Sequence, residues 1–300
     1  MEVPDGFTAS GKGMALRGKL LVAKKRQQML RVRLPGRTSA FKRLSSLSPD
    51  DVFNGDETAF FYQLLPDKTM NFKGDKCKGG KKSRLHVSVL FCCNSTGTEK
   101  LKPLVIGKSA KPRCLKNVSL PSDYRANKKA GMTRELFTQW LLQLDDTMKK
   151  KDRKILIVDN CSAHIVNVRL SNVKLEYMPP NCTSLLQPLD QGIIRCVRTE
   201  FWKRLVQRLL INIRLKLPTQ VNIRQAAEML TWSWWNVKAG LLKASPTPQD
   251  CEDTQELNQE LWDELTEKLP VDTAVTFDDY IDSDSVAATS AGAHQRRHCE

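Results

Sequence analysis

The chain has 300 residues and a formal net charge of +15, with 40% hydrophobic and 27% charged residues. This length allows one large domain or two small ones with a real core, and the composition is ordinary for a soluble globular protein. No apolar run reaches about eighteen residues, and the first ten residues lack the apolar core of a secretory signal. We therefore expect neither a membrane span nor secretion.

The charge is distributed unevenly along the chain. Residues 1–50 carry a net charge of +8 and residues 250–300 a net charge of −11, which leaves +18 for residues 51–249. A folded middle region with this excess favours a polyanionic partner, most simply nucleic acid. A solvated basic surface without such a partner is the alternative.

In chain order, residues 1–48 are basic and weakly periodic. A first strand is expected from Val52 to its end at Asp56, and a second over 58–70, closed by a Pro66–Asp67 turn. A basic, glycine-bearing loop follows, and further strands are predicted over 86–94 and 101–107. Residues 132–150 have the periodicity of a helix that Thr133 can cap.

The second half alternates strands and helices. The unbroken apolar run that begins at Lys154 predicts a strand covered on both faces, and a shorter strand is expected near residues 173–178. Helices are predicted within 183–213, 221–242 and 256–269. The first has a basic face that includes Arg198, and the second carries Trp232, Trp234 and Trp235, predicted as core aromatics. This order favours a mixed sheet covered by helices.

The cysteines and histidines do not predict a metal centre. Nine cysteines, an odd number without a C-x-x-C pair, indicate free thiols. His164 and the other three histidines do not cluster with cysteines at the spacing of metal ligands. We therefore do not expect a zinc site.

Three acids stand at expected element ends: Asp56, Asp159 and Asp190. Loops converge at such ends, and catalytic groups tend to collect there. Carboxylate oxygens are suitable ligands for Mg²⁺ or Mn²⁺, and three crowded carboxylates would repel one another without a cation. Each acid alone could instead cap a turn.

Three stretches carry a family resemblance: "DDVFNGDETAFFYQLLPDKT", "ILIVDNCSAH" and "MPPNCTSLLQPLDQGIIRCVRTEFWKRL". Together they resemble the DDE-superfamily domain of Tigger/pogo-type transposases, a family that includes the jerky proteins and centromere protein B. The resemblance covers about residues 50–215 and is fainter to about 285. It implies an α/β, RNase H-like fold, in which a mixed sheet flanked by helices brings three acids together.

Residue by residue, the resemblance implies that Asp56, Asp159 and Asp190 are catalytic and hold Mg²⁺ or Mn²⁺. Thirty residues separate the last two, close to the spacing of a pogo-like triad. Glu57 is a weaker candidate ligand. Asn160 and His164 share the central motif and are expected to support the ligands or the local structure.

The predicted organisation has four parts. A poorly defined basic segment (1–48) precedes the RNase H-like catalytic domain (49–215), a helical C-terminal extension (216–270) and a disordered tail (271–300). The expected partner is DNA and the expected location is the nucleus, and a homodimer is left open. The basic loop either contacts DNA phosphates or is merely solvated. The residues expected to make such contacts are Lys73, Lys76, Lys78, Lys81, Lys82 and Arg84.

The chain departs from the family pattern in two places. Such transposases normally begin with helix-turn-helix modules, which the residues before Asp56 do not show, and residues 231–240 look shorter than the corresponding helical stretch. The leading prediction is metal-dependent cleavage and strand transfer of DNA phosphodiesters. The alternative is a domesticated nucleic-acid-binding chromatin protein without catalytic turnover. A poorly folding pseudogene product is a third, weaker hypothesis.

Overall fold

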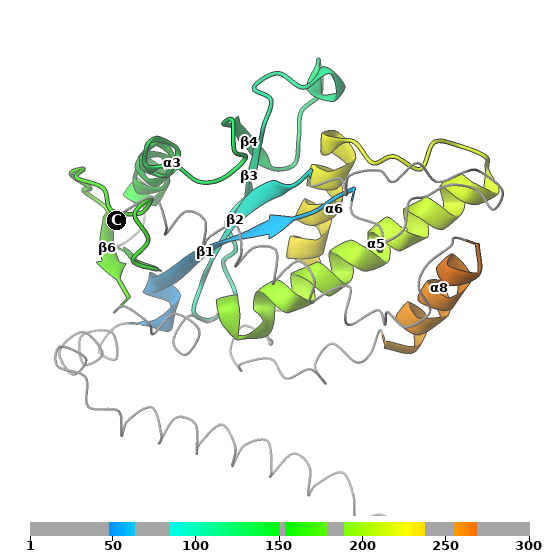
Figure 1. Ribbon diagram of the computed structural model, residues 1–300. Helices are drawn as coiled ribbons and strands as arrows, with labels where there is room; N and C mark the ends of the chain where they lie inside the picture. Colours follow the sequence, from blue (N-terminus) through cyan, green and yellow to red (C-terminus); the bar gives the residue numbers. More distant parts are fainter. Residues whose placement is uncertain (1–47, 64–84, 151–153, 179–188, 238–254, 269–300) are drawn as a thin grey trace, which may run out of the picture. The chain divides into compact units, whose positions relative to one another are not determined.

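The computed structural model describes residues 48–63, 85–150, 154–178, 189–237 and 255–268 (Figure 1). These residues belong to one compact unit. The predicted N-terminal segment, the predicted DNA-contacting loop (Lys73 to Arg84) and the predicted tail fall outside the described residues, except for Ser48. Across the described ranges, no helix combines the length and the apolar character needed to cross a membrane.

A six-stranded mixed sheet forms the centre of this unit, in the order β4-β3-β2-β1-β5-β6 (Figure 1). Neighbouring strands are antiparallel for β1–β2 and β2–β3, and parallel for β3–β4, β1–β5 and β5–β6. This confirms the predicted RNase H-like mixed sheet. The strands are β1 (Val52–Phe60), β2 (Val87–Asn94), β3 (Leu104–Gly107), β4 (Asp123–Ala126), β5 (Lys154–Val158) and β6 (Val173–Tyr177).

Strand β1 corrects the sequence prediction of two separate strands. Asp56 and Glu57 do not end a strand, because they lie within β1 and pair with Phe91 and Leu90 of β2. Successive side chains of a strand point to opposite faces, so two adjacent acids can be accommodated without breaking the ladder. Asp56 therefore occupies a rigid position in mid-strand.

Helices cover both faces of the sheet. Helices α5 (Ile194–Arg214), α6 (Ile223–Asn236) and α8 (Gln255–Lys268) contribute Phe201, Trp234 and Trp262 to one core, which also holds Phe60 of β1. Helix α3 (Arg134–Thr147) contributes Phe137 and its neighbours to the other core. Figure 1 shows α3 on one side of the sheet and α5 with α6 on the other. As predicted, Thr133 caps α3 by accepting from the Leu136 N–H at 3.3 Å.

Two helical predictions were partly wrong. Trp234 is buried, but Trp232 and Trp235 are 61% and 47% exposed, because α6 buries only one face against α5 and the sheet. Arg198, predicted on a basic outer face of α5, is buried and donates to the Thr58 hydroxyl of β1 at 2.5 Å. The side chain of Arg198 therefore joins α5 to the sheet.

Two strands also differ from expectation. Strand β4 was missed, since its sequence, Asp-Tyr-Arg-Ala, contains no apolar run. Strand β5 was predicted to be covered on both faces, but only Leu156 and Val158 are buried, while Ile155 and Ile157 are partly exposed. The core on the α5 side includes no residue of β5 among the described residues. One face of β5 therefore remains partly open.

Candidate metal-binding active site

The register between two parallel strands brings the segments of the first two predicted ligands together. Asn54 of β1 pairs with Ile157 of β5, and Asp159 follows β5 directly. Asp56 lies two residues beyond Asn54, and Asp159 two residues beyond Ile157. Segments more than a hundred positions apart in sequence thus lie side by side.

Asp56 is buried, with 8% of its surface exposed, and one carboxylate oxygen accepts the Glu57 N–H at 2.9 Å. By strand alternation it lies on the same side of β1 as Asn54, Thr58 and Phe60. Burying a carboxylate is unfavourable unless hydrogen bonds or a cation compensate for its lost hydration. The environment of Asp56 is therefore compatible with a cation ligand.

The third predicted ligand, Asp190, lies in the π-helical turn η4 (Leu189–Ile193), which leads into α5. The Leu189 N–H donates to the side-chain oxygen of Asn54 at 3.2 Å. The side-chain nitrogen of Asn54 donates in turn to the Ile157 carbonyl at 3.1 Å. One buried amide thus connects η4 and β5 to β1.

Asn54 is a residue that the sequence prediction missed. It lies two residues before Asp56, its first partner Ile157 lies two residues before Asp159, and its second partner Leu189 lies one residue before Asp190. A polar residue at an inward-facing position of an apolar strand was the available signal. The structure brings the three backbone segments together. Convergence of the three carboxylates remains a prediction, because the side chain of Asp190 is outside the described part and the Asp159 carboxylate is engaged with His164.

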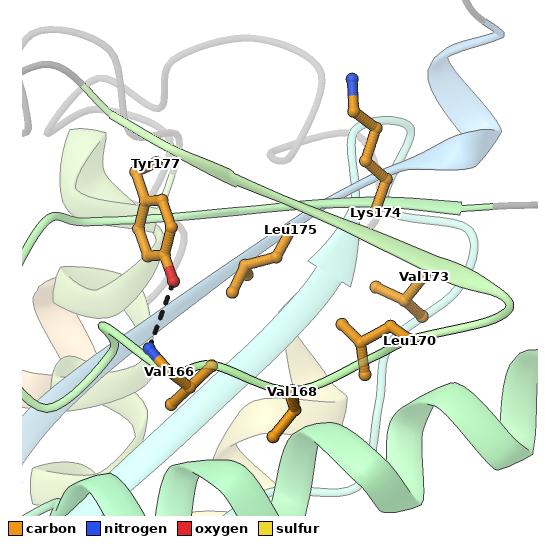
Figure 2. Close-up of a pocket in the computed structure, with 7 residues that line it drawn as sticks. All are labelled: Val166, Val168, Leu170, Val173, Lys174, Leu175 and Tyr177. Atoms are coloured by element: carbon orange, nitrogen blue, oxygen red, sulfur yellow. Dashed lines mark hydrogen bonds between the residues drawn. The ribbon is translucent and has the colours of Figure 1, made fainter.

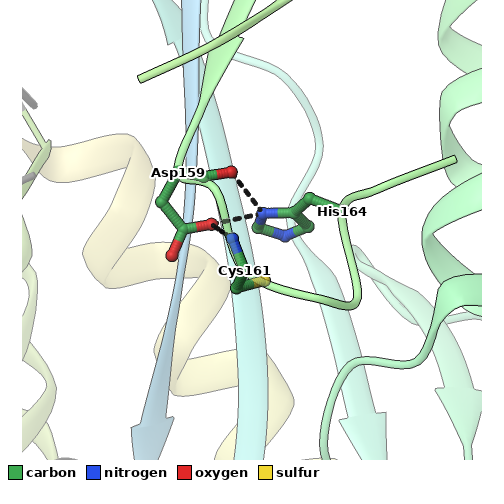
Figure 3. Close-up of side chains that lie close together, drawn as sticks. All are labelled: Asp159, Cys161 and His164. Atoms are coloured by element: carbon green, nitrogen blue, oxygen red, sulfur yellow. Dashed lines mark hydrogen bonds and ion pairs between the residues drawn. The ribbon is translucent and has the colours of Figure 1, made fainter. Parts of the chain in front are cut away.

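The side chain of Asp159 makes its shortest contact with His164, as Figure 3 shows. The Asp159 carboxylate lies 2.5 Å from His164 Nδ1, and the Glu57 carboxylate lies 2.7 Å from His164 Nε2. The imidazole is 1% exposed and packs against the ring of Phe137 at 4.4 Å between centroids. When both nitrogens donate, the ring is an imidazolium between two carboxylates.

The ionisation of this cluster follows from its contacts. Burial lowers the pKa of His164, but hydrogen bonds with Asp159, Cys161 and Glu57 outweigh it, and the net pKa is raised. Burial raises the pKa of Asp159, but hydrogen bonds from His164 and Cys161 outweigh it, and the net pKa is lowered. Without a cation, the cluster therefore holds Asp159 ionised beside a protonated His164.

The other residues of the two motifs separate into distinct roles. Glu57 lies on the face of β1 opposite Asp56, by strand alternation, and contacts His164. Asn160 is exposed.

The expectation that His164 does not cluster with cysteines was wrong: donor atoms of Asp159, Cys161 and His164 all lie within 4.8 Å of one another. The turn after β5 brings the three side chains together. The five described cysteines are free, as predicted.

A separate pocket of about 280 Å³ lies beside β6 (Figure 2). None of its lining residues is acidic, so it does not supply a metal site. Its Tyr177 hydroxyl donates to the His164 carbonyl at 3.0 Å and thereby anchors the turn that carries His164. The lining residues are Val166, Val168, Leu170, Val173, Lys174, Leu175 and Tyr177.

Comparison with known proteins identifies the family. Residues 84–245 match the family described as DDE superfamily endonuclease, a span that contains Asp159 and Asp190. The chain is 33% identical over 193 residues to Tigger transposable element-derived protein 4 of Mus musculus, covering 64% of this chain and 38% of that protein. It is 30% identical over 192 residues to Major centromere autoantigen B of Homo sapiens, covering 63% and 31%. The chain thus spans about a third of the length of these relatives.

Two further similarities complete the comparison. The chain is 34% identical over 162 residues to Jerky protein homolog of Homo sapiens, covering 50% of this chain and 29% of that protein. Among solved structures it is similar to the Mos1 strand transfer complex, with 13% identity, a TM-score of 0.37 and coverage of 84% and 63%. The chain belongs to the DDE superfamily endonuclease family, in its Tigger/pogo branch.

Proposed function

We propose that this chain contains a metal-dependent DNA endonuclease domain that cleaves phosphodiester bonds and, with a transposon end, transfers strands. The observation that carries the proposal is the Asn54 amide, which connects the backbone segments of Asp56, Asp159 and Asp190. The family pattern assigns these three acids as the metal ligands.

The donor set fits a hard divalent cation. Mg²⁺ and Mn²⁺ prefer oxygen ligands, and a few carboxylates plus substrate phosphate oxygens are sufficient to hold them. Asp56, Asp159 and Asp190 would supply the carboxylates. When bound, the cations activate water and stabilise the leaving oxygen of the phosphodiester.

The chain's own residues prepare this site before any cation binds. Strand β1 fixes Asp56, and the amide of Asn54 holds the neighbouring segments in register. His164 balances the negative charge of Asp159 and Glu57. The imidazolium thus reduces carboxylate repulsion in the metal-free chain.

DNA is the partner that the charge favours, because residues 51–249 carry the basic excess. We propose that binding depends little on sequence and weakens steeply with salt. Four further points remain predictions that accompany this proposal: phosphate contacts by the residues between Lys73 and Arg84, a nuclear location, the domain boundaries and a homodimer.

The test is a nicking assay on supercoiled DNA with Mg²⁺ or Mn²⁺, run beside filter binding. We expect weak nicking by the wild type and none by Asp159→Asn, with DNA binding unchanged or slightly tighter. Equal nicking by both proteins would indicate a contaminating nuclease and remove the support for catalysis.

A second function has its own supporting observation. The 2.5 Å contact with His164 already engages the Asp159 carboxylate, as expected of a domesticated DNA-binding protein in which the acids serve the fold. Full DNA binding without nicking by either protein, with both metal ions tried, would favour this function.

A further inference from the structure

The turn after β5 gathers three different donor atoms within 4.8 Å of one another: a carboxylate oxygen of Asp159, the Cys161 sulfur and a His164 ring nitrogen (Figure 3). This mixed set differs from the three carboxylates of the proposed catalytic site. Nitrogen and sulfur donors together with one carboxylate suit Zn²⁺ and similar borderline cations better than Mg²⁺.

The backbone holds these donors together. The His164 N–H donates to the Cys161 carbonyl at 3.0 Å, and the Cys161 N–H donates to the Asp159 carboxylate at 3.4 Å. Tyr177 of β6 fixes the turn from outside, through its hydrogen bond to the His164 carbonyl. The donors are therefore gathered by a short turn with a defined fold.

Glu57 provides an independent observation. A histidine that binds a metal through one ring nitrogen usually donates the other N–H to a carboxylate, which fixes the ring's orientation. Glu57 accepts from His164 Nε2 at 2.7 Å, while Nδ1 faces Asp159. The buried ring of Phe137 packs on the imidazole and limits its rotation. His164 thus already has the environment of a ligating histidine.

We propose that Asp159, Cys161 and His164 form a binding site for Zn²⁺ or a similar borderline divalent cation. On binding, the ion replaces the proton on His164 Nδ1 and the thiol proton of Cys161, so two protons leave as one cation enters. With tetrahedral Zn²⁺ bonds of about 2.0–2.3 Å, two ligands of one ion lie about 3.3–3.8 Å apart. The donors lie within 4.8 Å and the Asp159–His164 Nδ1 pair lies at 2.5 Å, so side-chain rotations that shift the donor atoms by about 1 Å form the site.

The site has a consequence for catalysis, which rests on the proposed function. Asp159 is a predicted ligand of the catalytic Mg²⁺ or Mn²⁺, and it cannot serve both sites fully. Zn²⁺ bound at Cys161 and His164 would draw the Asp159 carboxylate away, so we expect zinc to inhibit nicking. Cys161→Ser should nick in the presence of zinc at concentrations that stop the wild type.

Binding of the metal ion is measured without an activity assay, on the full chain after its metal has been removed. Cd²⁺ alone serves as the spectroscopic probe, because its bond to a thiolate gives an ultraviolet charge-transfer band. The matched control is Cys114, another partly exposed free thiol, in η2 (Arg113–Leu115). Comparing variants is essential, since the chain has nine cysteines.

We expect Cys161→Ser to take up one fewer Cd²⁺ ion than Cys114→Ser. Zn²⁺ should also raise the Tm of Cys114→Ser and leave that of Cys161→Ser nearly unchanged, which controls for misfolding. Glu57→Gln should weaken binding about tenfold or more while the number of ions stays the same.

Equal cadmium uptake by Cys161→Ser and Cys114→Ser would overturn the site. If the extra ion binds but no protein nicks DNA under any condition, the zinc site stands and the proposed endonuclease function fails. If nicking occurs and zinc uptake is independent of Cys161, the endonuclease stands and the zinc site fails.

Discussion

Two buried amides on the neighbouring strands β1 and β2 differ in what they connect. Asn94, at the end of β2, bonds to Thr98 and the backbone of Glu99 at 3.0 Å each, and so closes the turn that follows it; it also donates to Asp50, just before β1, at 3.4 Å. Asn54 bonds to residues 103 and 135 positions away. The same chemistry therefore stabilises mainly the turn after β2 in one case and joins three distant segments in the other.

The charged groups near the two amides differ in the same way. Lys100, near Asn94, donates to the carbonyls of Trp234, Trp235 and Val237 at the C-terminal end of α6, which the helix dipole favours. Near Asn54, one imidazole faces two carboxylates, and Asp56 is buried two residues along β1. The first arrangement joins one cation to neutral carbonyls, whereas the second places acidic side chains close to the predicted metal site.

The largest expected effect concerns the acids themselves. Asp56→Asn and Asp190→Asn should each reduce nicking by a hundredfold or more, since losing a ligand charge costs several kcal/mol in the transition state. Asp123→Asn is the matched control, because its carboxylate forms a surface ion pair with Lys102 at 2.8 Å. Initial rates on supercoiled DNA measure the effect. Full activity of Asp190→Asn would remove that residue from the site.

The two amides give the direct comparison. Asn54→Ala and Asn94→Ala should each reduce the free energy of unfolding by about 1–3 kcal/mol, because each leaves backbone groups without partners. Only Asn54→Ala should also weaken Mn²⁺ binding, by about tenfold to a hundredfold. Denaturant titration and Mn²⁺ binding by electron paramagnetic resonance measure the two quantities. If both variants bind Mn²⁺ equally well, Asn54 has a purely structural role.

Lys100→Met tests the charged group near Asn94. Methionine keeps the apolar stem but loses the charged hydrogen bonds to α6, so we expect a loss of about 1.5–3 kcal/mol in unfolding free energy. Lys102→Met, which removes only an exposed ion pair, should cost less than about 1 kcal/mol. Thermal and denaturant unfolding compare the two. Both variants should bind Mn²⁺ like the wild type, and a weakened affinity would show that the Lys100 contacts are coupled to the metal site.

The smallest expected effect concerns an acid with no role in cation binding. Asp145, in α3, accepts the N–H groups of Ser171, Asn172 and Val173 at 2.8–3.0 Å. Burial raises its pKa, but these bonds outweigh it and the net pKa is lowered. Its stabilisation is therefore present above the unfolded pKa of about 3.9 and is lost as pH falls through the lower folded value.

Asp145→Asn should lower the Tm at neutral pH by about 2–4 °C, for a loss of about 1 kcal/mol. The difference from the wild type should shrink as pH falls below about 4 and disappear only below the lowered folded pKa of Asp145. Melting curves across this range measure it. A difference that persists unchanged in acid would mean that the carboxylate charge is not what stabilises the loop.

Local patterns in the sequence were sufficient for the helices, most strands and two of the motifs. Thr133 as a cap and the helical stripe of Phe137 and Leu141 depend on neighbours within one or two turns, so periodicity predicts them. The family resemblance implied the sheet and the identity of the three acids. It did not reveal that Asp56 lies within a continuous strand, because a polar pair in an apolar run resembles a strand end.

Only the tertiary structure decided which polar groups meet. Asn54 was missed because its partners Ile157 and Leu189 are distant in sequence, and hydrogen bonds across such separations depend on strand register. The Glu57–His164–Asp159 contacts likewise depend on packing β5 beside β1. The exposure of Trp232 was decided by the face of α6 that meets the core. Sequence patterns are periodic and local, whereas the site is formed by contacts between segments that the chain itself separates.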